Sequence, residues 1–222
     1  MVIFTGGSWG VGEWKFNQLS GFGVANYFNE QDVTVNLCRS GLSSKQQLDN
    51  LEDFLNRYRH ADTDLVYWLV HNPLVGINPE DIYQNCTTLE SSIAEHLDKQ
   101  LLMANDIAHK HNMVIHTIGA SCDLNTTDMT RFDRLIVKVP SWGKLLTTDY
   151  PASIISHQID HDTDLKTALT EHRPDLLDEY YNKLKGTAFK KRKFMQKNED
   201  LFTSFHPTSL GHRILKEYLQ NN

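Results

Sequence analysis

Short apolar runs alternate along the chain with longer stretches in which apolar residues recur at helical spacing. The short runs are rich in β-branched and aromatic residues and end at Gly, Asn, Ser or Pro, so they predict strands. Most of these runs are nearly continuous in apolar residues and do not alternate with polar ones, which is typical of a sheet buried on both faces. Strands are expected at 2–5, before a Gly6-Gly7-Ser8 turn, and at 33–38, 65–70, 113–118 and 135–139. Helices are expected at about 23–29, 44–58, 88–111 and 209–219.

Strand and helix alternate, which predicts an α/β fold: a three-layer α/β/α sandwich with a parallel sheet. The 222 residues are enough for one domain spanning 1–222. The polar, His-rich segment at about 149–199 interrupts the alternation. We interpret it as a helical insertion, which either caps the ligand edge of the sheet or forms a surface helical pair without a functional role.

Composition narrows the class of partner. The formal charge is −6, and basic residues are spread out except at 190–193, so a nucleic-acid partner is not expected. No apolar stretch approaches the roughly 20 residues that cross a bilayer, and no basic leader precedes the first strand, so we expect a cytoplasmic protein without membrane contact. The three cysteines (Cys38, Cys86, Cys122) match no disulfide framework or zinc site, and we expect them to be small buried hydrophobes. The oligomeric state is left open.

Polar residues follow the predicted strands at positions that bring them to one edge of the sheet. Ser8 follows the first strand after two glycines, Gly41 follows the second strand, and Asn72 follows the third. His206 lies just before the last helix. Such a set suits acyl transfer, because the imidazole takes the Ser8 proton as the hydroxyl attacks a carbonyl. The Ser8 and Gly41 N–H groups and the Asn72 side chain would stabilise the oxyanion.

These residues resemble the four sequence blocks of the SGNH/GDSL hydrolases. The matching residues are Gly6-Gly7-Ser8-Trp9-Gly10, Gly41, Asn72, and His206-Pro207 with Gly211-His212, in the family's order over nearly the whole chain. The resemblance implies a flavodoxin-like sheet, Ser8 as nucleophile, His206 as general base, and Ser8, Gly41 and Asn72 as oxyanion hole. It also implies hydrolysis of a small-molecule or carbohydrate ester, as a serine esterase or O-deacetylase, without a cofactor. The opening residues look most like SGNH-like proteins of phages, which would imply a viral origin.

The sequence departs from the family pattern at three positions. Gly7 stands where the family usually has Asp, and Pro73 stands at another common Asp position. Thr203 stands where the Asp of the triad is expected. Loss of that carboxylate costs about four orders of magnitude in a serine protease. A Ser–His dyad, with Thr203 or a backbone carbonyl holding the ring, is one alternative, and substitution by Glu199 or Asp200 is another.

A second hypothesis uses the same opening residues. The spacing Thr5-Gly6-x-x-x-Gly10-x-Gly12 matches the cofactor turn of NADP-dependent short-chain dehydrogenases, and Arg39 could meet a 2′-phosphate. Tyr181 and Lys185 have the catalytic spacing of those enzymes. Against this hypothesis, Glu13 would repel a pyrophosphate at the following helix.

A third hypothesis is a binding module on a hydrolase-like scaffold, weakly active or inactive, which Thr203 favours. Trp9, Trp14 and Trp142 could then stack on sugar rings, although core packing is their more common role. No metal is assigned, because the pair His157 and His161 lacks the general-base Glu of a zinc protease helix.

Overall fold

A computed structural model describes most of the chain. The described residues are 1–15, 18–19, 21–28, 33–58, 64–71, 88–120, 122–150, 170–171, 174–178, 181, 193–194, 196–203 and 206–222.

The centre of the molecule is a sheet of five parallel strands in the order β4-β1-β5-β6-β7. Numbered by their sequence within this sheet, the strands lie in the order 2-1-3-4-5, one of the two common orders of doubly wound α/β proteins. The α/β fold expected from the sequence is confirmed. The strands are β1 (Val2–Gly6), β4 (Thr34–Asn36), β5 (Leu65–Val70), β6 (Ile115–Gly119) and β7 (Leu135–Val139).

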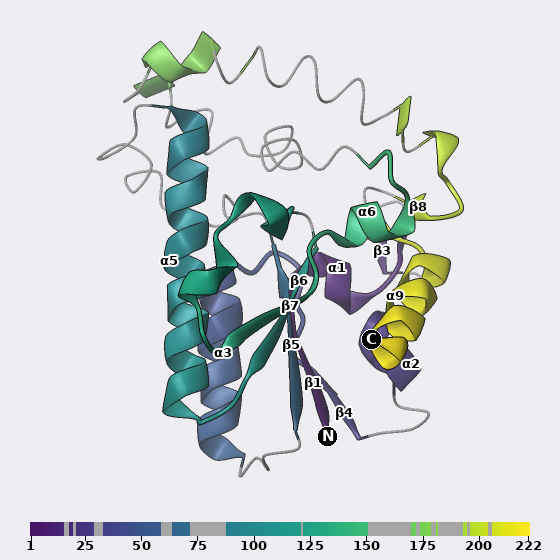
Figure 1. Cartoon of the computed structure of the whole chain (residues 1–222). Coiled ribbons are helices and arrows are strands. Elements are labelled where there is room, and N and C mark those ends of the chain that lie inside the picture. The colour runs from purple at the N-terminus through teal and green to yellow at the C-terminus, as the bar shows by residue number, and fades with distance from the viewer. Residues whose placement is uncertain are drawn as a thin grey trace.

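Helices cover both faces of this sheet, which gives the three expected layers (Figure 1). On one face α3 (Ser44–Arg57) and α5 (Leu89–Lys110) bury a leucine-rich core against the strands. On the other face α2 (Val24–Phe28), α6 (Trp142–Leu146) and α9 (Ser209–Asn221) enclose a second core rich in aromatic rings. Each face of the sheet is therefore apolar, as the continuous apolar strands predict.

The shorter elements lie mainly at the carboxyl edge of the sheet. They are α1 (Ser8–Val11), the hairpin β2 (Trp14–Lys15) and β3 (Gln18–Leu19), the 3₁₀ turns η1 (Leu124–Thr126), η2 (Met129–Arg131) and η3 (Pro174–Leu176), and the hairpin β8 (Phe202–Thr203) and β9 (His206–Pro207).

Two helix starts have the capping chemistry that fixes a helix N-terminus. Ser43 accepts from the Gln46 N–H while the Gln46 side chain accepts from the Ser43 N–H, and Thr88 and Ser91 form the same box at α5. The second strand is shorter than expected. Leu37 and Arg39 still donate to β1 carbonyls beyond its end, and the intervening Cys38 N–H donates to Asn36 Oδ1.

Several expectations fall partly outside the described residues. Most of the segment 149–199 does so, and its role as a cap stays a prediction, as does the single domain. At its described ends, Tyr150 and Phe194 pack on each other and on Phe202. Cys38 and Cys122 are buried free thiols, whereas Cys86 lies outside the described residues.

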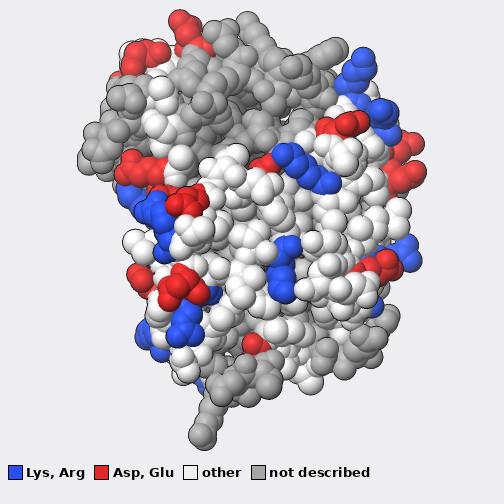
Figure 2. Space-filling view, in the orientation of Figure 1, with Lys and Arg blue, Asp and Glu red and all other residues white. Residues whose placement is uncertain are grey.

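Two surface properties bear on partners. Basic and acidic side chains are interspersed over the face shown in Figure 2, without a broad surface of either sign among its described residues. In the described part of the chain, every helix is too short or too polar to cross a membrane.

Candidate active site

Ser8 lies at the carboxyl end of β1, where the strand changes directly into a helix. The strand ends at Gly6, Gly7 is extended, and Ser8 is the first residue of α1. In a parallel sheet this edge is where ligands bind. The Ser8 side chain is partly exposed, so its hydroxyl can meet a ligand.

His206 reaches this serine from the other end of the chain. It lies in β9, just before Thr208 caps α9 by accepting from the Gly211 N–H. The His206 Nε2 and Ser8 Oγ atoms are 2.8 Å apart across 198 positions of sequence. This is hydrogen-bond distance and the reach that proton transfer requires. The structure thus brings together the two residues that the sequence predicts as nucleophile and base.

Glu13 ties the segment that carries Ser8 to the segment that carries His206. Its Oε2 accepts from the Ser209 backbone N–H at 2.7 Å and from the Ser209 hydroxyl at 2.6 Å. A carboxylate at a helix N-terminus also interacts favourably with the helix dipole. This contact was not predicted from the sequence. Its partner lies 196 residues away, which no local pattern indicates.

His71 is a second imidazole near Ser8, packed against the preceding Gly7, and no sequence pattern predicted this position. It follows β5 and is only 7% exposed. A Cβ atom on Gly7 would lie 2.1 Å from its Cδ2, so the ring fills the space beside that glycine. Burial, with a smaller contribution from the charge of His206, lowers the pKa of His71 to about 4. His71 is therefore neutral at pH 7.

His212 is a third imidazole, which lies on α9 and is fully buried. It packs edge-on to Trp142, with ring centroids 5.0 Å apart. Burial lowers the pKa of His212 to about 4, although the Gly12 backbone and the Glu13 carboxylate act in the opposite direction. Of the three imidazoles, only His206 is partly exposed, which favours it as the base.

The predicted oxyanion residues are only partly described. Gly41 lies in an exposed turn with a φ of +79°, a conformation that favours glycine, and open space surrounds the position of its absent Cβ. The buried Gln47 holds this turn by donating to the Leu42 carbonyl at 2.9 Å. Asn72 lies outside the described residues. The oxyanion role of Ser8, Gly41 and Asn72 therefore stays a prediction.

Thr203 is the direct cross-strand neighbour of His206 in the β8–β9 pair. Residues opposite one another in an antiparallel pair project their side chains from the same face, with Cβ atoms about 4.5–5.5 Å apart. The position of the missing triad acid is thus adjacent to the imidazole. Glu199 and Asp200, the alternative acids, are exposed.

Two of the three tryptophans considered for sugar stacking belong to the core. Trp9 and Trp142 are fully buried and pack edge to face at 5.5 Å. Trp9 also contacts the rings of Tyr150 and Phe202. Since Trp9 directly follows Ser8, this packing fixes the backbone next to the nucleophile. Nothing is described of the Trp14 side chain.

The dehydrogenase hypothesis requires a long helix after the first strand. The helix α1 has four residues and ends at Gly12, and a short strand follows it. A turn of this length does not form the extended helix N-terminus on which a pyrophosphate rests. Lys185, His157 and His161 lie outside the described residues. Among the residues that are described, no group of three or more metal-ligating side chains occurs.

The sequence matches no family model and no curated protein. Among solved structures, the chain is similar to a member of the lipolytic GDSL family from Veillonella parvula, with 15% identity, a TM-score of 0.45, and coverage of 99% of this chain and 96% of the other. It is also similar to a protein described as an acylhydrolase from Bacteroides fragilis, with 11% identity, a TM-score of 0.40, and coverage of 99% and 84%. Because both TM-scores are below 0.5, we draw the function from the geometry around Ser8 and not from these likenesses.

Proposed function

We propose that the chain is a serine-dependent hydrolase of ester or acetyl groups, either a serine esterase or a carbohydrate O-deacetylase. The observation that carries the proposal is the 2.8 Å contact between Ser8 Oγ and His206 Nε2 at the carboxyl edge of the sheet. Ser8 attacks the carbonyl carbon and its proton passes to His206. The protonated imidazole then gives this proton to the departing alcohol, which leaves an acyl group on Ser8. Water then attacks the acyl carbonyl carbon as its proton passes to His206. The protonated imidazole returns this proton to Ser8 Oγ, which leaves as the acid is released.

The oxyanion of both tetrahedral intermediates needs donors at the same edge. The Ser8 N–H lies at the start of α1, and we assign the Gly41 N–H and the Asn72 side chain to the same task. His71 and His212 are neutral at pH 7, so they place no competing positive charge beside His206 when it becomes protonated.

A fluorophosphonate probe and p-nitrophenyl acetate test this proposal. We expect labelling of the wild-type chain at Ser8, and loss of both labelling and turnover in Ser8→Ala and His206→Ala. The matched control is Ser40→Ala, an exposed serine in the turn before Gly41. Labelling that persists in Ser8→Ala, or its absence from the folded wild-type chain, would contradict the proposal.

A binding module of low or no activity is the second candidate, and Thr203 beside His206 favours it. In a serine protease triad the carboxylate orients the imidazole and stabilises its charged form, and threonine cannot supply that charge. Saccharide binding by a folded protein that neither labels nor turns over would support this candidate.

A further inference from the structure

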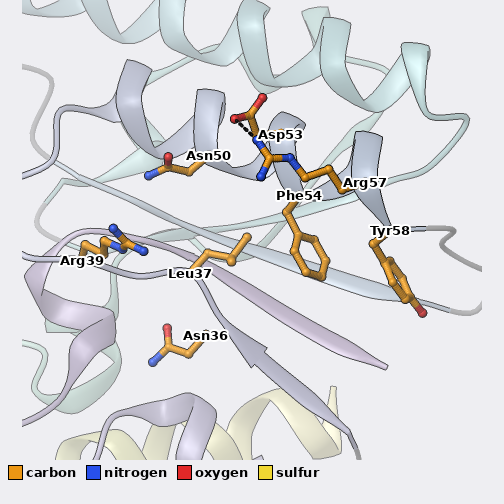
Figure 3. Close-up of a pocket in the computed structure, with 8 residues that line it drawn as sticks. All are labelled: Asn36, Leu37, Arg39, Asn50, Asp53, Phe54, Arg57 and Tyr58. Carbon is orange, nitrogen blue, oxygen red and sulfur yellow. Dashed lines mark hydrogen bonds and ion pairs between the residues drawn. The ribbon is translucent and has the colours of Figure 1, made fainter.

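A groove of about 470 Å³ runs between β4 and α3, outside the Ser8 and His206 pair (Figure 3). β4 is an edge strand of the sheet, so no further strand of the sheet lies on its outer side. The helix buries one stripe of side chains on the sheet and lines the groove with the adjacent stripe, at positions 50, 53, 54, 57 and 58. Asn36 and Arg39 line it from the strand side.

The charge of the groove is opposite in sign to the charge of the chain. Arg39 is exposed, and in the described part of the chain its guanidinium makes no hydrogen bond or ion pair. Arg57 contacts Asp53 at 3.5 Å, but the two side chains are 82% and 70% exposed, so water weakens this pair. Two guanidinium groups against one carboxylate leave a local positive charge on a chain of net charge −6. Guanidinium groups bind carboxylates through two parallel hydrogen bonds.

The remaining lining groups suit a ring with an apolar face and polar edges. Phe54 and Tyr58 stack on each other with centroids 5.3 Å apart and planes inclined by 21°, and both extend from α3 toward the strand side (Figure 3). Asn36 and Asn50 supply amides that donate and accept hydrogen bonds. A sugar ring offers C–H groups to an aromatic face and hydroxyl groups to amides.

One end of the groove lies next to the nucleophile segment. The Arg39 N–H donates to the Gly6 carbonyl at 3.1 Å, two residues before Ser8. From this edge α3 runs back along the sheet, and Asn50 to Tyr58 spans about 12 Å of helix. A chain-like ligand can thus extend from the carboxyl edge along β4.

We propose that this groove binds an acidic oligosaccharide, whose carboxylates contact Arg39 and Arg57 and whose rings pack on Phe54 and Tyr58. Its place as the distal part of the ester substrate rests on the proposed function. Binding itself does not depend on hydrolysis, so the two can be tested apart.

Isothermal titration calorimetry with hexagalacturonate, which carries no ester, measures binding without turnover. We expect saturable binding that Arg39→Gln, Arg57→Gln and Tyr58→Ala each weaken about tenfold, and much weaker binding of neutral cellohexaose. Arg213→Gln is the matched control, because Arg213 is an exposed arginine on α9. Thermal melts establish that each variant is folded.

No binding, or binding that the groove variants leave unchanged, would overturn the proposal. Equal affinity for hexaglutamate would overturn it too, since charge alone would then be recognised. Saccharide binding by a folded chain that the fluorophosphonate does not label would refute the proposed hydrolysis and support the groove proposal. Labelling at Ser8 without saccharide binding would support hydrolysis and refute the groove proposal.

Discussion

Gly7 is a glycine because of His71 and not because of its own backbone. Its φ of −90° and ψ of −156° are extended values that any residue adopts. The obstacle is steric: a Cβ would lie 2.1 Å from the His71 Cδ2, whereas carbon atoms in contact stay about 3.5 Å apart or more. In Gly7→Ala the ring must therefore retreat by about 1.4 Å. A side chain that is 7% exposed cannot do so without repacking its neighbours.

We expect Gly7→Ala to lower the free energy of unfolding by about 3 kcal/mol, the upper part of the usual range for overpacking. For a chain of this size the melting temperature falls by about 6–12 °C. Equilibrium denaturation in urea, followed by tryptophan fluorescence, measures the change. His71→Ala alone also destabilises, because it removes a buried ring and leaves a cavity.

The double variant Gly7→Ala/His71→Ala provides the decisive comparison. Since the alanine methyl group enters space that the ring has vacated, its loss of stability should be smaller than the sum of the two single losses by about 1.5–3 kcal/mol. Gly41→Ala is the control, because no atom lies within 4 Å of its absent Cβ and only its φ of +79° costs energy. That cost is about 1 kcal/mol, and His71→Ala should not relieve it. Additive losses in the double variant, or a Gly7→Ala protein as stable as the wild type, would refute the steric account.

Three further predictions concern the residues around Ser8 and His206. Thr203→Asp places a carboxylate opposite His206 and should raise kcat on p-nitrophenyl acetate at least about tenfold. The uncharged Thr203→Asn should not raise kcat. Equal kcat values for the two variants would exclude an orienting role for a carboxylate at position 203. Glu13→Gln weakens the contacts to Ser209, so it should lower the free energy of unfolding by about 1–2 kcal/mol and slow fluorophosphonate labelling. An unchanged free energy of unfolding and an unchanged labelling rate would show that the contact between Glu13 and Ser209 is dispensable. The pKa of His71 and of His212 is about 4 in the folded chain against 6.5 for an ordinary imidazole, so the unfolded chain binds more protons between these values and stability falls as the pH falls. We expect a loss of about 2 kcal/mol per histidine from pH 7 to 4.5, reduced in His212→Asn, whereas a flat stability profile would contradict the burial of neutral rings.

The sheet was predictable because each of its strands carries its own local signal. The runs at 65–70 and 135–139 coincide with β5 and β7, and Ser43 caps α3 as its position suggests. The second predicted strand, β4, ends at Asn36, short of its run at 33–38, and the Cys38 N–H donates to the Asn36 side chain. Such local side-chain hydrogen bonds are not visible in hydrophobic spacing.

The contact between Ser8 and His206 was predictable from strand-end placement and from the resemblance to a family. The surroundings of the pair were not. Gly7 follows β1 and His71 follows β5, and Glu13 contacts Ser209 from 196 residues away. Neither contact can be predicted from the periodicity of hydrophobic residues. Gly7 in place of the usual Asp is now explained, since His71 leaves no room there for any side chain.

The separation of 198 positions between Ser8 and His206 has a consequence for the newly made chain. At a synthesis rate of about 5–20 residues per second, the ribosome reaches the codon for the imidazole some 10–40 seconds after the hydroxyl has been incorporated. During this interval the proposed general base is not yet part of the chain. On the proposed function, reactivity of Ser8 toward a fluorophosphonate therefore requires the segment that carries His206 and α9 to dock, which labelling of nascent chains stalled at different lengths would test.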